Sequence, residues 1–201
     1  MATLRPSSRW AIAAATTALA GVALTGTVIA GQLRQTDPEA FRADLATGEI
    51  EQVADIAAAD GLRAHGVFVQ QTEMGRVCLW DAPSALSPQR GGGCNSAEDP
   101  LGGSTISASL AYEGGPEAES IRDARLVGLA ASDVAAVELL MTDGTRRSVR
   151  LKTATIGTAD FKAFGHRFKR SDLRKGLGPI AVVALDSSGA EIGRQKTGFG
   201  G

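Results

Sequence analysis

The chain has 201 residues, with 21 Lys or Arg, 22 Asp or Glu and two Cys. A formal net charge of −1 gives no general attraction to nucleic acid, so we expect no nucleic-acid partner. Without the first 31 residues, 170 remain, which is enough for one domain with a real core but short of two.

The first predicted element is a run of 24 residues without a formal charge, Trp10 to Leu33, which follows Arg5 and Arg9. As a helix it would cross a bilayer core of roughly 30 Å. Two interpretations stay open, an uncleaved transmembrane anchor or a signal peptide cleaved after Ala30. The apolar core is longer than the roughly 7 to 15 residues of a signal peptide, which favours the anchor. Two arginines before the run predict that residues 1–9 are cytoplasmic and that the rest is extracytoplasmic.

Residues 34–61 are predicted to form a helical stalk or linker. Asp37, Pro38 and Glu39 make a good helix start, because they supply a cap, a preset φ and an acid near the positive end of the helix dipole. The apolar residues that follow have helical spacing, which predicts one broken helix or two short ones over about 38–59.

From residue 62 the pattern becomes that of strands. Val67–Val69 and Val77–Trp80 are predicted to form a hairpin, and Ile106–Tyr112 alternates as in a sheet with one buried face. A turn at Thr142–Thr145 predicts a second hairpin, and a turn at Asp186–Ala190 predicts a third. The other predicted strands are Ala124–Leu129, Val137–Met141, Val149–Leu151, Ile180–Leu185 and Glu191–Lys196.

About eight short strands with Gly-rich turns predict a mainly β domain over residues 62–198, a small sandwich or partly open barrel. Ile180–Leu185 is apolar on both faces, so we expect it at the centre of its sheet. Segment 156–173 stays ambiguous. Its phenylalanines Phe161, Phe164 and Phe168 have helical spacing, whereas alternation of Phe164, His166 and Phe168 suits a strand.

Cys78 and Cys94 are separated by a stretch that contains two prolines and three glycines, which let it fold back. In an oxidising compartment we expect them to form a disulfide. Two free thiols or a functional pair are the alternatives, and the absence of a Cys-x-x-Cys arrangement disfavours a redox role. A zinc site would have to combine both cysteines with His65 and His166, which lack the close paired spacing of such sites, so we expect no metal and no cofactor.

The sequence lacks the common local motifs of enzymes. It contains no Gly-x-Ser-x-Gly elbow, no Gly-x-x-x-x-Gly-Lys phosphate loop, no His-Glu-x-x-His and no Ser-x-x-Lys. The sequence therefore nominates no catalytic residue. His65 and His166 could still join a site assembled in space, so an exported hydrolase stays open as the alternative to a binding or structural module.

Charge is distributed unevenly along the chain. Residues 32–123 carry 15 acidic and 6 basic side chains, whereas residues 124–201 carry 7 and 13. If the fold gathers the basic ones, they would attract the anionic groups of envelope polymers or lipid heads. The alternative is a solvated strand face balanced by the acidic half. The candidate anion-binding residues are Arg146, Arg147, Arg150, Lys152, Lys162, Arg167, Lys169 and Arg170, with Arg174 and Lys175 continuing the series.

Five features together define the layout of the chain. They are the short basic start, the Ala-rich span, the Val77-Cys78-Leu79 strand, the loop of three glycines before Cys94, and the closing turn at Asp186–Gly189. This layout resembles that of uncharacterised membrane-anchored or exported β-domain proteins of the actinobacterial type. The resemblance agrees with export, a disulfide and an all-β domain, and it implies no activity. We therefore expect a module held in the cell membrane by residues 10–33, with an envelope protein or an anionic envelope polymer as its partner.

Overall fold

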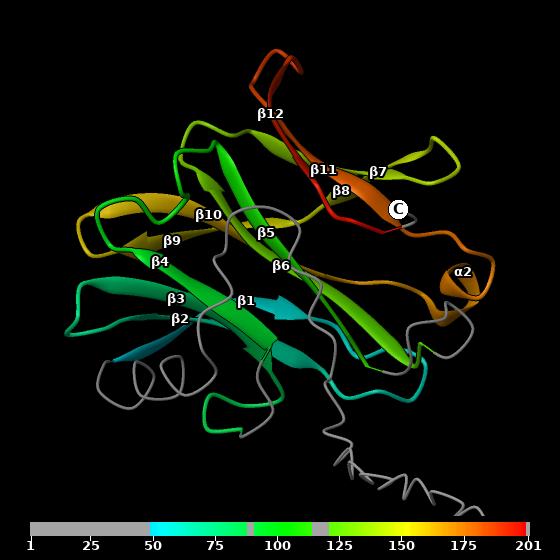
Figure 1. Ribbon diagram of the computed structural model, residues 1–201, viewed down its shortest axis with the longest axis horizontal. Coiled ribbons are helices and arrows are strands. Elements are labelled where there is room, and N and C mark those ends of the chain that lie inside the picture. Colours follow the sequence, from blue (N-terminus) through cyan, green and yellow to red (C-terminus); the bar gives the residue numbers. More distant parts are fainter. Residues whose placement is uncertain (1–48, 88–90, 114–120, 200–201) are drawn as a thin grey trace, which may run out of the picture.

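The computed structural model describes residues 49–87, 91–113 and 121–199, which form three antiparallel four-stranded sheets (Figure 1). Sheet 1 has the order β1 (Ile50–Ile56), β2 (His65–Gln71), β3 (Arg76–Ala82) and β4 (Gly91–Ser96). Sheet 2 has the order β5 (Ile106–Glu113), β6 (Asp123–Ala131), β10 (Ala159–Arg167) and β9 (Leu151–Ile156). Sheet 3 has the order β12 (Glu191–Lys196), β11 (Pro179–Leu185), β7 (Ala136–Met141) and β8 (Arg146–Val149).

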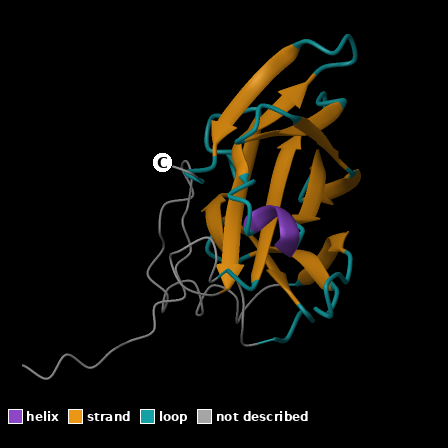
Figure 2. Cartoon of the chain, turned by 90° about the vertical axis from the view of Figure 1, so that its right-hand side faces the viewer, coloured by secondary structure: helices purple, strands orange, loops and turns teal. Residues whose placement is uncertain are grey.

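One short helix, α2 (Arg170–Leu173), lies against these strands in Figure 2. The expected mainly β class is therefore confirmed. The expected number of about eight strands is too small, because the described residues contain twelve. The extra strands include β1, from the predicted stalk, and β4, from the glycine-rich predicted loop.

Sheet 2 lies between the other two sheets and has an apolar core on each face (Figure 1). Successive side chains of a strand point to opposite faces, so Leu126 of β6 packs toward sheet 3 with Leu139, while Val127 packs toward sheet 1 with Val67 and Ile56. All five side chains are at most 1 % exposed. This position explains why both faces of β5 are buried, where the sequence predicted one.

The predicted helical stalk is wrong where the structure describes it. Residues 50–56 form β1, which pairs antiparallel with β2, so the domain includes this strand and does not begin at residue 62. The register of β1 shifts between Gln52 and Ala54. Such a bulge adds one residue to a strand and breaks strict alternation, which produced the apparent helical spacing of Val53 and Ile56. The anchor, the cleavage position and the rest of the stalk, residues 1–48, lie outside the described residues.

Gly92 explains why the glycine-rich segment forms a strand. It pairs with Trp80 of β3, and a Cβ at Gly92 would lie 2.6 Å from the Cβ of Trp80. Only glycine leaves room for the strand to approach there. Gly165 of β10 plays the same part between layers, since a Cβ there would lie 2.6 Å from Cγ1 of Ile56 and hold sheet 1 away from sheet 2.

The ambiguous segment 156–173 contains the end of β9, all of β10 and then α2. Phe161 packs toward sheet 1, and Phe164 packs toward sheet 3. The hairpin of β2 with β3 and the hairpin of β11 with β12 are confirmed, and β11 is an inner strand as predicted. The turn at Thr142–Thr145 is also confirmed, but Leu151 belongs to β9 of sheet 2 and not to the strand that contains Val149.

Candidate functional site

The most connected group of polar side chains in the described residues lies between sheets 1 and 2 and is centred on Arg125. Arg125 projects from β6, and only 6 % of the residue is exposed. Its Nε donates to Oδ2 of Asp81 on β3 at 2.5 Å, and its Nη1 donates to Asp123 at the start of β6. Both terminal nitrogens lie 3.3 Å from Oε1 of Glu113 on β5. Arg125 therefore ties the two sheets together.

The network extends from both carboxylates. Nδ1 of His65 lies 2.7 Å from the same Oδ2 of Asp81. Nε of Arg167, on β10, donates to Oδ1 of Asp123 at 3.0 Å. Nη1 of Arg167 also donates to the carbonyl oxygens of Ala57 and Arg63, each at 2.8 Å. Arg167 thus fastens the connection between β1 and β2 to sheet 2. We name the set His65, Asp81, Asp123, Arg125 and Arg167 the Arg125 network.

The charges of the Arg125 network are buried and compensate one another. Burial by itself lowers the pKa of the Arg125 guanidinium, but the carboxylates of Asp81 and Asp123 outweigh burial and raise that pKa. The group therefore stays cationic at every pH at which the protein folds. Oδ1 of Asp81 is buried and accepts no hydrogen bond within the described residues. The Coulomb gain of such a buried network is largely offset by desolvation, so we infer that it selects which surfaces meet and adds little net free energy.

The two histidines lie at separate places. Within the part of the chain that the structure describes, His65 makes its one polar side-chain contact with Asp81. His166 lies on β10 and meets the ring of Phe168 edge-on, with the ring centroids 4.9 Å apart. Burial lowers the pKa of His166, and the nearby charge of Arg147 lowers it further. The structure therefore does not bring the two imidazoles into one site.

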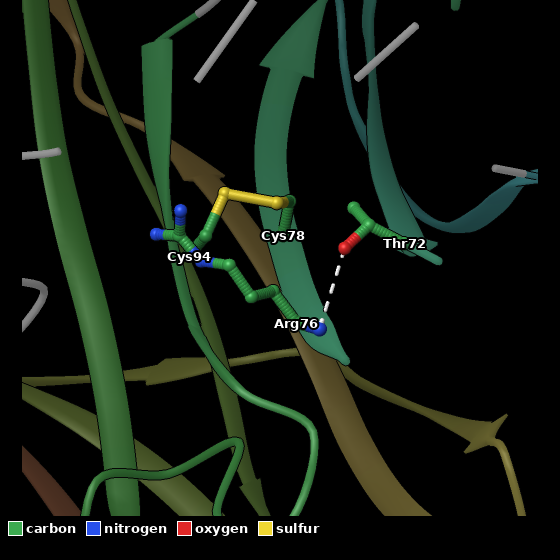
Figure 3. Close-up of a disulfide and its surroundings, with 4 residues drawn as sticks. All are labelled: Thr72, Arg76, Cys78 and Cys94. Carbon is green, nitrogen blue, oxygen red and sulfur yellow. Dashed lines mark hydrogen bonds between the residues drawn. A yellow bond between two sulfur atoms is a disulfide. The ribbon is translucent and has the colours of Figure 1, made fainter. Parts of the chain in front are cut away.

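The disulfide joins Cys78 and Cys94, which face each other in the register of β3 and β4 (Figure 3). The predicted pairing is confirmed. It lies on the face of sheet 1 opposite to sheet 2, beside the stacked rings of Phe68 and Trp80. Arg76 extends along the same face toward Cys94, and its backbone N–H donates to Oγ1 of Thr72 at 3.3 Å. Both cysteines are thus used structurally, and no group of three or more metal-ligating side chains gathers in the described residues.

A concavity of about 650 Å³ lies at the end of sheet 1 that is away from the Arg125 network. Its acidic side chains are Glu49, Glu51 and Glu73, and Gln71, Thr72 and Thr155 add neutral polar groups. Neither this concavity nor the small cavity of about 10 Å³ between Leu79, Ser107 and Leu129 is lined by a histidine or by a predicted basic residue. The cavities therefore do not coincide with any site residue predicted from the sequence.

The predicted anion-binding residues do not form one surface. Arg146 pairs with Glu138 at 3.0 Å, and Arg147 pairs with Asp172 at 2.6 Å. The side chain of Arg167 is buried in the Arg125 network, and Nζ of Lys162 donates to Thr153. Arg150 and Lys152 are exposed where the chain passes from β8 to β9. The remaining exposed members gather around α2, and they are Lys169, Arg170, Arg174 and Lys175.

The Arg125 network was not predicted from the sequence. Part of its signal is visible in hindsight, because Asp81 directly follows the apolar run Val77–Trp80 and Arg125 directly precedes the apolar run Leu126–Leu129. A charged residue in such a segment is buried with a partner when the strand has neighbours on both faces. Asp123 lies two residues before Arg125 on the same strand, but Asp81 and Arg167 come from strands far apart in the chain, and no spacing rule links them to β6.

Comparison with protein-family models, with curated proteins and with solved structures found no match for this chain. Among the helical residues that the structure describes, no segment is long and apolar enough to cross a membrane. The chemistry of this chain alone therefore has to support any function assigned to it.

Proposed function

We propose that this protein is a membrane-tethered extracytoplasmic module whose β-domain binds a partner or serves a structural role. The disulfide between Cys78 and Cys94 carries the proposal, because such bonds persist in oxidising compartments outside the cytoplasm. The uncharged run Trp10–Leu33 after two arginines supplies a route to that compartment and an anchor in the membrane. The two features are independent of each other and lead to the same location.

The test uses cells that produce the full chain. We expect the protein in the membrane fraction after extraction with alkaline carbonate, and accessible to protease added outside the membrane. Both thiols should resist a maleimide reagent under denaturing conditions until a reductant is added. Recovery of the full-length chain from the cell interior with two reactive thiols would overturn the proposal.

The mass of the mature chain separates the two forms of export. An intact N-terminus supports the tether. A chain that begins at residue 31 would reject the tether and keep only the extracytoplasmic location.

A hydrolase is the second candidate, and the hydrogen bond between His65 and Asp81 is the observation that favours it. Such a couple orients an imidazole for general base catalysis. Against this role, Oδ2 of Asp81 also accepts from Arg125, and no described hydroxyl bonds to His65. Labelling of the full chain by a fluorophosphonate probe, lost in His65→Gln, would support the hydrolase. Equal absence of labelling in both forms would favour the module.

A further inference from the structure

The four exposed basic side chains around α2 form a compact surface that we name the basic turn, residues Lys169, Arg170, Arg174 and Lys175. Within the described residues none of these side chains makes an ion pair. The acid inside the same segment, Asp172, is already paired with Arg147 at 2.6 Å. Among the described residues, therefore, no acid neutralises the basic turn, and its positive charge is available to an anionic group.

The backbone of the basic turn is held in place from several sides. Phe168 and Leu173, which flank and end α2, are 2 % and 1 % exposed in the core toward sheet 3. The N–H of Arg170 donates to Oδ2 of Asp60 at 3.1 Å, and Oγ1 of Thr142 donates to the carbonyl oxygen of Gly176 at 2.9 Å. The four cations are thus displayed by a fixed segment at one side of the sheets, where α2 lies in Figure 1.

The neighbouring acids that the structure describes do not cancel this charge. Asp60 lies beside Arg170 but is accompanied by exposed Arg63, and the carboxylate of Asp143 accepts hydrogen bonds from Thr145 in its own turn. Exposed charges of this density attract anions over about a Debye length, roughly 8 to 10 Å at physiological salt. A surface that presents many phosphates in one plane suits the basic turn better than a single small anion.

We propose that the basic turn docks on the anionic head groups of the bilayer in which the chain is anchored. This inference rests on the proposed membrane tether. The 16 residues from 34 to 49 join the apolar run to β1 and span at most roughly 50 to 60 Å when extended. Anionic lipid is therefore within reach of the domain at all times, and tethering raises its effective concentration. Docking would fix the β-domain on the membrane with the opposite side free for a partner.

The test reconstitutes the full chain in liposomes of phosphatidylcholine, with or without about 30 % phosphatidylglycerol. A membrane-impermeant amine reagent labels exposed lysines, and mass spectrometry compares Lys169 and Lys175 with exposed Lys196 on β12 in the same molecules. We expect labelling of the two turn lysines, relative to Lys196, to fall roughly threefold in the anionic liposomes. Protection should disappear at about 0.5 M salt because the charges are screened.

Two matched variants sharpen the result. The double variant Arg170→Glu with Arg174→Glu should lose the protection of Lys169 and Lys175. The double variant Arg150→Glu with Lys152→Glu changes the net charge equally at exposed positions outside the turn and should keep it. Both variants should melt at the same temperature as the native chain, which would show that neither change unfolds the domain.

The outcomes distinguish this inference from the tether. Equal labelling in both kinds of liposome, from a chain that alkaline extraction leaves in the bilayer, would overturn the docking and keep the tether. Release of the chain by alkaline extraction would overturn the tether and the docking with it. Protection by soluble polyglutamate on neutral liposomes, without protection by anionic lipid, would reject lipid in favour of a soluble polyanion.

Discussion

The two faces of sheet 2 are buried by different chemistry. The face toward sheet 3 is lined by apolar side chains such as Leu126, Phe164 and Leu139, each with no measurable exposure. The face toward sheet 1 is apolar over most of its length, but one end holds the Arg125 network. The same sheet therefore uses burial alone on one side and burial with ion pairing on the other.

This difference teaches what each interface contributes. Apolar burial gains free energy in proportion to area and accepts many arrangements of similar shape. Buried charges gain little net free energy, but a wrong alignment leaves them unpaired at high cost. We infer that sheet 3 packs on sheet 2 by area, whereas the Arg125 network selects the alignment of sheet 1.

The largest effect is expected for Arg125→Ala. The variant leaves Asp81 and part of Asp123 buried without their cation, which should lower the free energy of unfolding by roughly 3 to 5 kcal/mol. Urea denaturation at neutral pH measures the loss. Arg194→Ala is the control, because Arg194 pairs with Glu191 on the surface and its removal should change little.

A double variant sharpens the meaning of that loss. Arg125→Met with Asp81→Leu removes both buried charges of one pair and leaves Asp123 with Arg167. We expect it to be more stable than Arg125→Ala, since no unpaired Asp81 carboxylate remains. Equal loss in the two variants would show that shape, and not charge, accounts for the effect.

On the opposite face, Leu139→Ala should lower the free energy of unfolding by roughly 2 to 5 kcal/mol, because Leu139 is completely buried in the core toward sheet 3. The same urea denaturation measures it. Leu139→Met keeps the volume and should cost far less. If the two variants were equally unstable, the core would not be packed as described.

The disulfide lies outside both interfaces, so it tests a contribution from the unfolded chain. Cys94→Ser removes the disulfide between two residues that are 16 positions apart. It should lower the free energy of unfolding by about 3 kcal/mol in oxidising buffer. With a reductant present, the native chain and the variant should unfold alike. A loss that persists under reducing conditions would assign the effect to packing of the sulfur atom.

The smallest effect concerns His166 on the face toward sheet 3. Its lowered pKa, caused by burial and by Arg147, means that the unfolded chain binds a proton at a higher pH than the folded chain. The stability that the neutral imidazole of His166 contributes is present above the ordinary histidine pKa of about 6.5, and it is lost as the pH falls below that value. Urea denaturation at several pH values should show that the free energy of unfolding falls less on acidification for His166→Gln than for the native chain. An unchanged decrease would exclude His166 as its source.

Several features could be predicted from the sequence because they depend on neighbouring residues. Alternation along Ile106–Tyr112 and the turns at Thr142–Thr145 and Asp186–Ala190 identified strands and hairpins correctly. The prediction failed at β1, where a bulge imitated helical spacing. The sequence left open whether the basic residues gather, because the partners of Arg146 and Arg147 come from other elements, Glu138 from β7 and Asp172 from α2.

By itself, the sequence determined the mainly β class, most hairpins and the pairing of the only two cysteines, because strand alternation, turn chemistry and thiol pairing act over short ranges. Only the tertiary structure decided that sheet 2 is buried on both faces, that Arg125 meets Asp81 from 44 positions away, and that four cations stay exposed around α2. These features arise when strands distant in the chain pack together. Burial and charge pairing then depend on neighbours that no local pattern specifies.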